Sequence, residues 1–393
     1  MLADKIYRHL LWAGVAALIV FAAAARGAVK IWAMAPVLIV EFFLVFLWAV
    51  RGNGPRKLTV TPIGLPAALF VLLAAISCLR SAYVHDSLYA FAVLLGYIGI
   101  YYLIVNEFDR GMRKALVLAA VGAGAVLSAY GLLQYIGLLP HQWWYPQEFL
   151  SSTYVNHNHF AGFLELTIPA AIGFAVYKRK IWMAAVIAVM MAAFLMTQSR
   201  GGWMCLGAGL CVMFAVILRN EKSSRKNTAV LISVMMLISL VVLIYFGKEV
   251  VSRRIETITG ASGQEVSSDV RLKIWKGSMN IIAHNPVIGT GIGTFVWAFP
   301  KYRPAGLDLQ ANSAHNDYLH MASEMGVLAP VIMIWIFAVV IGTGLRKGMS
   351  DPVILGLAIG FLSLCMHGLV DFNFHIPANM ILFTVWAAVI MRR

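Results

Sequence analysis

The chain consists largely of long apolar runs separated by short polar segments. Each run holds about 17 to 22 residues, enough for one α-helix to cross the roughly 30 Å hydrocarbon layer of a membrane. Unpaired backbone groups are costly in lipid, so such runs are expected to be helical. The sequence predicts an all-α polytopic membrane protein with about twelve transmembrane helices. The predicted spans are residues 9–25, 31–50, 62–80, 87–106, 114–136, 158–177, 181–198, 202–218, 229–246, 321–344, 352–370 and 375–391.

The first apolar run has some features of a signal peptide. Lys5 and Arg8 precede it, and small residues end it at Ala22–Ala25. A second span follows closely, so we expect the first span to be retained. Its removal would leave the later topology unchanged.

Composition agrees with a membrane protein and explains the charge. The 393 residues are 61% hydrophobic and 12% charged, about half the charged share of a soluble protein. The formal net charge is +14, and most Lys and Arg fall in the short segments that alternation of the spans places on the same side as the N-terminus. This is the positive-inside pattern, so we expect both termini to be cytoplasmic. Anionic membrane lipids are then the natural counter-charge, and no nucleic-acid partner is implied.

The four cysteines add no site to this picture. Each lies inside an apolar span, where a reduced thiol packs as a small hydrophobic group. They are Cys78, Cys205, Cys211 and Cys365. No CxxC pair occurs, so we expect no thiolate metal site.

The spans divide the chain into three parts: residues 1–246 with nine spans, a long outer segment at 247–320, and three more spans at 321–393. A loop of that length usually folds as an element of its own. Within it, "SSDVRLKIWKGSMNIIAH" has Ser268 as a candidate N-cap and predicts an amphipathic helix along the membrane surface. No predicted strand precedes the following "GTGIGTF", so we expect a flexible connection there and no dinucleotide site.

Polar residues gather at the predicted outer ends of the spans. They are Asn156, His157 and His159 in "TYVNHNHFAGF", Arg200 in "TQSRGGW", Arg271 in the long segment, His315 and Asn316 before the tenth span, and Asp371 in "DFNFH". Each also has a structural explanation. Arg200 can end a helix beside its C-terminal dipole, the histidines can be loop residues, and Asp371 can cap a turn. Glu41 and Glu165 lie within spans, where we expect them to pair inside the bundle, although buried carboxylates are also functional candidates.

His315 is the polar residue that best fits a catalytic role. A histidine at the start of a helix, with arginines on the same side of the membrane, suits a general base beside an anion site. The planar arginine fork suits phosphate. A polyprenyl diphosphate that carries a sugar chain fits this combination, with its tail among the spans and its diphosphate near Arg200 and Arg271.

Three segments, in this order and spacing, resemble the bacterial O-antigen ligase and polymerase superfamily. They are "SRGGW", "RLKIWKGSMNIIAHNPVIGTGIGTF" and "AHNDYLHMASEMGV", and together they cover about residues 195–330. "HGLVDFNFHIPAN" extends the resemblance more loosely toward the end of the chain. The first half is similar mainly in hydropathy.

The resemblance implies an inverting, metal-independent glycosyl transfer on the periplasmic side of the bacterial inner membrane. The donor would be a glycan on undecaprenyl diphosphate, and the acceptor a sugar hydroxyl. No cofactor is implied, and the chain has no DxD pair. The motif residues Arg200, Arg271 and His315 would be catalytic. The predicted substrate-binding residues are Arg200, Arg271, Asn316, Asn156, His157, His159 and Asp371.

The acceptor separates the possible activities. A ligase uses lipid A–core, whereas a polymerase uses another lipid-linked glycan. The moderate length of the chain and its excess of Lys and Arg over Asp and Glu resemble ligases and favour that activity. A protein O-oligosaccharyltransferase is a further alternative. A transporter of lipid-linked glycans is a rival from another class, but the sequence shows no evident repeat.

Overall fold

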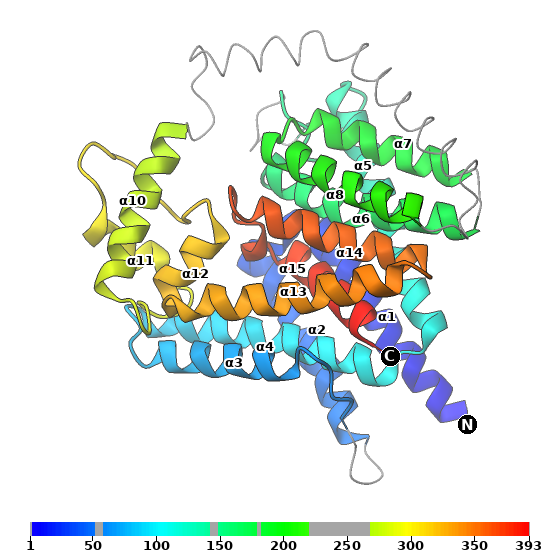
Figure 1. Cartoon of the computed structure of the whole chain (residues 1–393), viewed down its shortest axis with the longest axis horizontal. Coiled ribbons are helices and arrows are strands. Elements are labelled where there is room, and N and C mark those ends of the chain that lie inside the picture. The colour runs from blue at the N-terminus through cyan, green and yellow to red at the C-terminus, as the bar shows by residue number, and fades with distance from the viewer. Residues whose placement is uncertain (1, 52–57, 142–147, 179–181, 220–267, 393) are drawn as a thin grey trace.

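The computed structural model describes residues 2–51, 58–141, 148–178, 182–219 and 268–392, and these form helices and connecting loops without a strand (Figure 1). The helices are α1 (Leu2–Ala24), α2 (Ile31–Val50), α3 (Gly64–Cys78), α4 (Val84–Glu107), α5 (Arg110–Tyr135), α6 (His157–Lys178), α7 (Trp182–Met196), α8 (Arg200–Arg219), α10 (Ser268–His284), α11 (Phe295–Tyr302), α12 (Asp317–Met325), α13 (Leu328–Gly348), α14 (Pro352–His367) and α15 (Pro377–Met391), with short 3₁₀ turns η1 (Arg26–Ala28) and η2 (Asn373–His375). The predicted ninth span, 229–246, lies outside the described residues, as does the first part of the outer segment.

The apolar helices account for the other predicted spans. Seven described helices are long and apolar enough to cross a membrane, namely α1, α2, α4, α5, α6, α8 and α13. Four shorter apolar helices are α3, α7, α14 and α15. The polytopic all-helical architecture predicted from hydropathy is therefore found in the described part of the chain.

The tenth span does not begin where the sequence predicts. One helix was expected over 321–344, but α12 ends at Met325, Gly326 is its C-cap, and α13 begins at Leu328. Gly326 has φ +82°, and a Cβ there would lie 2.2 Å from the carbonyl oxygen of Val287. The preceding loop therefore packs against the break, and only glycine fits that approach. The prediction of a continuous helix is wrong at this point.

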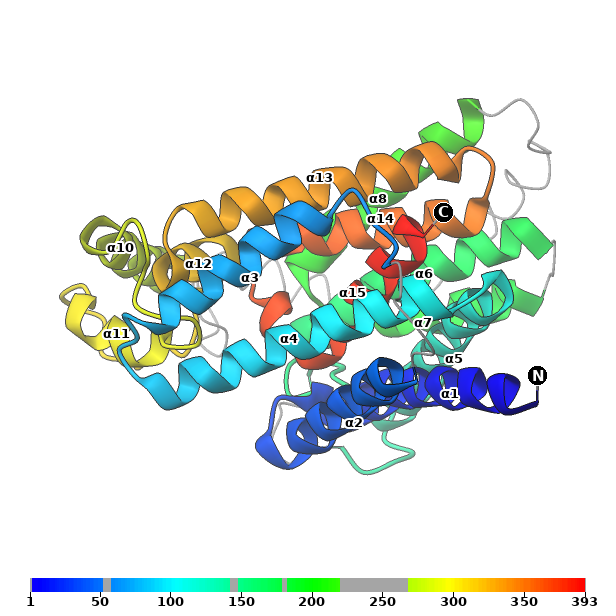
Figure 2. The same ribbon diagram turned by 90° about the horizontal axis from the view of Figure 1, so that it is seen from below.

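The two ends of the bundle differ. Helices α10, α11 and α12 lie beyond one end, and both chain termini lie toward the other (Figures 1 and 2). At the terminal end, Arg8 pairs with Asp109 at 2.9 Å and Arg110 with Asp351 at 3.3 Å. These ion pairs join helix ends that alternation of the spans places on one side of the membrane.

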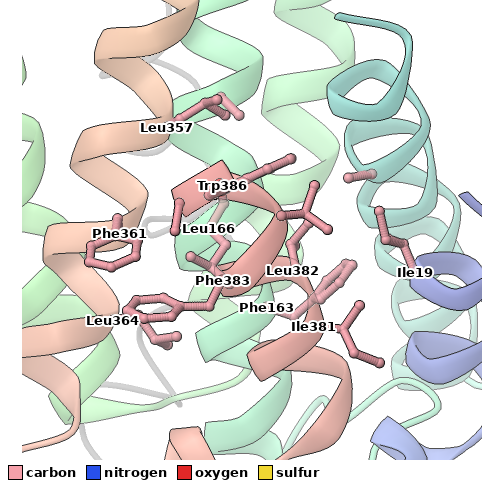
Figure 3. Close-up of a cluster of buried hydrophobic side chains, with 14 of the residues drawn as sticks. Ile19, Phe163, Leu166, Leu357, Phe361, Leu364, Ile381, Leu382, Phe383 and Trp386 are labelled. Carbon is pink, nitrogen blue, oxygen red and sulfur yellow. The ribbon is translucent and has the colours of Figure 1, made fainter. Parts of the chain in front are cut away.

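Helices α6, α14 and α15 form the centre of the bundle. Figure 3 shows Phe163 and Leu166 of α6 beside Trp386 of α15 and apolar side chains of α14. The rings of Phe361 and Phe383 stack with centroids 3.7 Å apart. The indole of Trp386 donates to the carbonyl oxygen of Leu166 at 3.0 Å, although a mid-helix carbonyl normally bonds only within its helix. The centre is thus closely packed around one buried polar contact.

Glycines let α6 and α14 approach closely. Gly356 and Gly360 have the small-xxx-small spacing of membrane helix pairs. A Cβ on Gly356 would lie 2.2 Å from the carbonyl oxygen of Pro169, and one on Gly360 would lie 2.9 Å from that of Glu165. This contact brings the Glu165 region of α6 against α14, where the candidate site begins.

Gly356→Ala is expected to destabilise the folded protein by about 1–3 kcal/mol, because the added methyl group overlaps the α6 backbone. The chemical-unfolding midpoint in mild detergent measures the loss. Gly342→Ala in α13 is the matched control, since no atom lies within 4 Å of the position of its added Cβ. Equal midpoints for the two variants would contradict the close packing of α6 on α14.

The end of the outer segment folds as a small element of its own. The predicted amphipathic helix is present as α10 and begins at Ser268. Its residues Ile274 and Ile281 are buried with Phe295 and Phe299 in a separate small core. The face of α10 that carries Ile274 and Ile281 therefore packs on protein, and the position of α10 along the membrane surface stays a prediction.

The glycine-rich loop after α10 is closely packed, contrary to the flexible connection expected. Gly291 has φ +104°, and a Cβ there would lie 2.6 Å from the Cα of Ser81. The Glu324 carboxylate accepts the backbone N–H groups of Gly293 at 2.8 Å and Phe295 at 2.9 Å. The loop thus ties the α3–α4 turn to α12.

Candidate functional site

Several helix ends meet at the end of the bundle nearest α10. The turn after α14, residues 367–372, is the centre of this region. Its carbonyl oxygens hold the surrounding elements: that of Leu369 accepts from the Asn316 side chain at 2.8 Å, and that of Val370 accepts from Arg271 at 3.2 Å. The turn therefore joins α10 and the start of α12 to the membrane bundle.

His315 lies directly before the N-cap of α12 and faces the turn 367–372 through Asp371. It has φ +48°, a left-handed conformation, and it stands at the entry to a helix, as the sequence predicted, one residue before the N-cap Asn316. Its side chain is 19% exposed, and its Nδ1 lies 3.9 Å from Oδ1 of the almost fully buried Asp371. This distance suits an ion pair but is too long for a hydrogen bond. Among the described residues Nδ1 has no hydrogen-bond partner.

Asp371 is placed to act on that imidazole. Burial alone would raise the pKa of its carboxyl, but the surrounding histidines, first of all His315, hold the pKa below its ordinary value. Its Oδ1 also accepts the backbone N–H of Phe372 at 2.8 Å. An ionised carboxylate therefore faces His315 at neutral pH.

A second histidine shares the site. The ring of Phe372 lies between His159 and His315, with centroids 4.7 Å and 4.9 Å away and nearly perpendicular planes. His159 lies in the first turn of α6 and is buried, and its Nε2 has no hydrogen-bond partner in the described part of the chain. Two imidazoles with an uncommitted nitrogen thus flank one aromatic ring.

Arg271 and the segment that carries Arg200 approach the same turn from different helices. Arg271 of α10 donates through Nη1 to the Val370 carbonyl, while its buried Nε is unpaired among the described residues. Arg200 is exposed and is the first residue of α8, so the explanation that it ends a helix is wrong. A Cβ on the next residue, Gly201, would lie 3.0 Å from Cγ2 of Val370. Val370 is therefore a neighbour of both arginine-bearing segments.

Residues 184–334 match the family described as O-antigen ligase, a range that contains Arg200, Arg271 and His315. This match covers less than half of the chain and supports its resemblance to the O-antigen ligase and polymerase superfamily. The resemblance seen in the motifs over 195–330 is confirmed. No curated protein matches the chain.

Three other predicted substrate-binding residues hold the helix ends around the site in place. Asn316 is the N-cap of α12: its Oδ1 accepts from two backbone N–H groups at 3.0 Å each, and its Nδ2 bonds to Leu369. Asn156 accepts from the backbone N–H of Asn158 at 2.8 Å at the start of α6. His157 is buried and its Nδ1 bonds to the carbonyl of Thr197. These side chains fix the helix ends that carry the site.

A group of three residues beside the site has the donors of a metal centre. His320, Glu324 and His375 place one ligand atom each within 4.8 Å of one another. Their atoms, however, already bond within the protein. His320 Nε2 lies 3.1 Å from Glu324, and His375 Nδ1 donates to Asp317 at 2.8 Å. Each imidazole has its own carboxylate, so the group is complete as a hydrogen-bonded clamp between α12 and η2.

The stability that His375 contributes to this clamp is expected to fall as the pH rises. Burial alone would lower the pKa of His375, but its bond to Asp317 and the nearby Glu324 hold that pKa above its ordinary value. His320 stacks on His375 with centroids 4.0 Å apart. Because the folded-state pKa of His375 is raised, its contribution is fully present below about pH 6.5 and is lost as the pH passes the folded-state value.

His375→Gln should therefore lower the melting temperature in detergent most at acidic pH, with the gap to the native chain narrowing as the pH rises into the alkaline range. His284→Gln on the exposed end of α10 is the control, because its Nδ1 bonds only within its own helix. A gap that stays constant across this range would contradict the assignment of a charged His375.

Other residues at the site were missed from the sequence. Trp275, one turn after Arg271, has a buried Nε1 without a described partner. His367 bonds through Nδ1 to Glu165 at 2.6 Å, which confirms the expectation that Glu165 pairs inside the bundle. A histidine inside an apolar span was the available signal for His367.

The same expectation of pairing inside the bundle is wrong for Glu41, since neither of its buried oxygens has a partner among the described residues.

Proposed function

We propose that this protein is an O-antigen ligase. It transfers a glycan from undecaprenyl diphosphate to a sugar hydroxyl of lipid A–core, at the periplasmic face of the bacterial inner membrane, with both termini cytoplasmic. One observation carries the proposal. His315, Asp371 and Arg271 converge on the turn 367–372, with uncommitted nitrogens on His315 and Arg271, beside a bundle of apolar helices.

His315 acts as the general base in this proposal. Its Nδ1 faces Asp371, which leaves Nε2 to take the proton of the acceptor hydroxyl. The hydroxyl oxygen then attacks the anomeric carbon from the face opposite the diphosphate. The bond from that carbon to the diphosphate oxygen breaks, and undecaprenyl diphosphate leaves with the bonding electron pair. The new linkage has the inverted configuration.

The arginines stabilise the leaving group. Negative charge builds on the diphosphate as its bond to the sugar breaks, and arginine forks that strengthen their hold at that moment accelerate the step. Arg271 is held in place by Val370 and its buried Nε is unpaired among the described residues, and Arg200 belongs to the neighbouring first turn of α8. In this proposal these fixed cations do the work of a divalent ion, and no cofactor is involved.

Asp371→Asn is expected to lower kcat about 10- to 100-fold with little change in KM for the donor, because the imidazolium formed in the transition state loses its ionised partner. Steady-state rates in proteoliposomes measure this. Asp351→Asn is the control, since Asp351 pairs with Arg110 at the other end of the bundle. Matching rates in the native and Asp371→Asn chains would exclude Asp371 as the partner of the base.

The acceptor decides between the ligase and a polymerase. Purified chain is supplied with undecaprenyl-diphosphate-linked glycan in EDTA, with lipid A–core in one reaction and no second acceptor in the other. Glycan on lipid A–core in the first reaction alone supports the ligase. Longer lipid-linked chains in the second would make it a polymerase, and no transfer in either would exclude both.

A further inference from the structure

Glu165, Ser363 and His367 form a polar cluster inside the helix bundle that the proposed reaction does not use. Glu165 of α6 accepts hydrogen bonds from Ser363 and His367 of α14, both at 2.6 Å. The Glu165 and His367 side chains are 0% and 1% exposed. Buried ion pairs give little net stability compared with apolar packing, so such a cluster calls for another explanation.

The cluster lies directly against the first turn of α8. A Cβ on Gly201 would lie 2.9 Å from His367 Nε2, and a Cβ on Gly202 would lie 3.1 Å from Glu165 Oε1. The two glycines that follow Arg200 therefore allow the pair to contact the α8 backbone. This explains the residue types in "SRGG", where any side chain at position 201 or 202 would push the turn away.

The same residues fix the direction of that turn. Ser199 caps α8 by accepting the backbone N–H of Gly202 at 3.3 Å. The Glu165 carboxylate stands beside this positive end of the helix dipole, which favours a negative charge. On its other side, the carbonyl oxygen of His367 accepts the backbone N–H of Asp371 at 3.0 Å. His367 thus contacts the arginine turn through its ring and the Asp371 turn through its backbone.

We propose that Glu165 and His367 are positioning residues that hold the first turn of α8 against the turn 367–372. They set where Arg200 stands relative to Arg271 and Asp371. The catalytic consequence rests on the proposed function, because it requires Arg200 to meet the diphosphate. The placement of the turn does not depend on that function.

The kinetic test compares Glu165→Gln and His367→Gln with the native chain in proteoliposomes. A misplacement on the order of 1 Å at a catalytic group can cost about 100-fold, so kcat should fall about 10- to 100-fold while KM for the donor changes little. Trp386→Phe is the matched control. It removes another buried hydrogen bond to α6, between α15 and the carbonyl oxygen of Leu166. A fall of the same size in Trp386→Phe would overturn the proposal.

A double-mutant cycle tests whether the effect passes through Arg200. In the Arg200→Ala background, His367→Gln should cause almost no further loss of kcat, because the group that it positions is already absent. Losses that multiply in the double variant would mean that His367 acts independently of Arg200, contrary to the proposal.

A third measurement does not require transfer activity. A nitroxide spin label is attached at Arg200→Cys, in a chain whose Cys78, Cys205, Cys211 and Cys365 are replaced by alanine. Its mobility should rise in Glu165→Gln and His367→Gln and stay unchanged in Trp386→Phe. Unchanged mobility in all three variants would overturn the positioning role even if the native chain transfers glycan. If the mobility rises in Glu165→Gln and His367→Gln while the native chain shows no glycan transfer, the proposed function is overturned and the positioning role remains supported.

Discussion

Replacing His315 by alanine is expected to reduce the rate of glycan transfer about 100- to 10,000-fold, the range typical of a lost general base. A sugar hydroxyl is a poor nucleophile, and no other described imidazole both faces Asp371 at ion-pair distance and retains an accessible side chain. Donor affinity should stay within about threefold of the native value, because the diphosphate is bound by the arginines.

Single-turnover rates at saturating donor, together with binding of labelled undecaprenyl diphosphate, measure the two quantities separately. His284→Ala is a suitable control, because this exposed histidine bonds only within α10. A normal single-turnover rate in His315→Ala would exclude its role as the base. A loss of donor binding equal to the loss of rate would instead make His315 a binding residue.

Replacing Arg271 by alanine is expected to lower kcat about 100- to 1,000-fold. This is the loss typical when an enzyme loses one hydrogen-bond donor that stabilises charge in the transition state. Arg271 approaches the turn 367–372 from α10, with Nη1 bonded to Val370 and Nε buried and uncommitted among the described residues. Arg271→Lys should recover only part of the rate, because an ammonium group keeps the charge but not the planar fork.

The control for general surface charge lies on the same helix. Lys276 is exposed on α10, and Lys276→Ala should leave kcat unchanged. Steady-state kcat for the three variants is measured at one ionic strength, because exposed charges are screened by salt. A comparable fall in Lys276→Ala, or full activity in Arg271→Lys, would contradict bidentate stabilisation of the leaving group by Arg271.

Hydropathy predicted the helices because a membrane span must satisfy its own backbone hydrogen bonds. It failed at 321–344 for a definite reason. The break at Gly326 depends on contact with the Val287 carbonyl, which lies far outside any hydropathy window. The packing of the loop after α10 is likewise set by Glu324 and the α3–α4 turn.

The site was predictable in part. Topology alone placed Arg200, Arg271, His315 and Asp371 on one side, and the structure gathers their segments around the turn 367–372. The roles of Asn316 and Asn156 were not predictable, because the side chains that bind sugars also cap helices. Glu165 and His367 are 202 positions apart, so only the α6–α14 contact shows that they pair.

The configuration of the new glycosidic linkage is the most direct test of the proposed one-step displacement at His315. The product formed on lipid A–core by the purified native chain in EDTA is compared with the donor by NMR at the anomeric carbon. Inversion is the expected result, since His315 takes the proton while the arginines hold the departing diphosphate on the opposite face. Retention would require either a double displacement or attack from the same face as the departing diphosphate, and would contradict this mechanism.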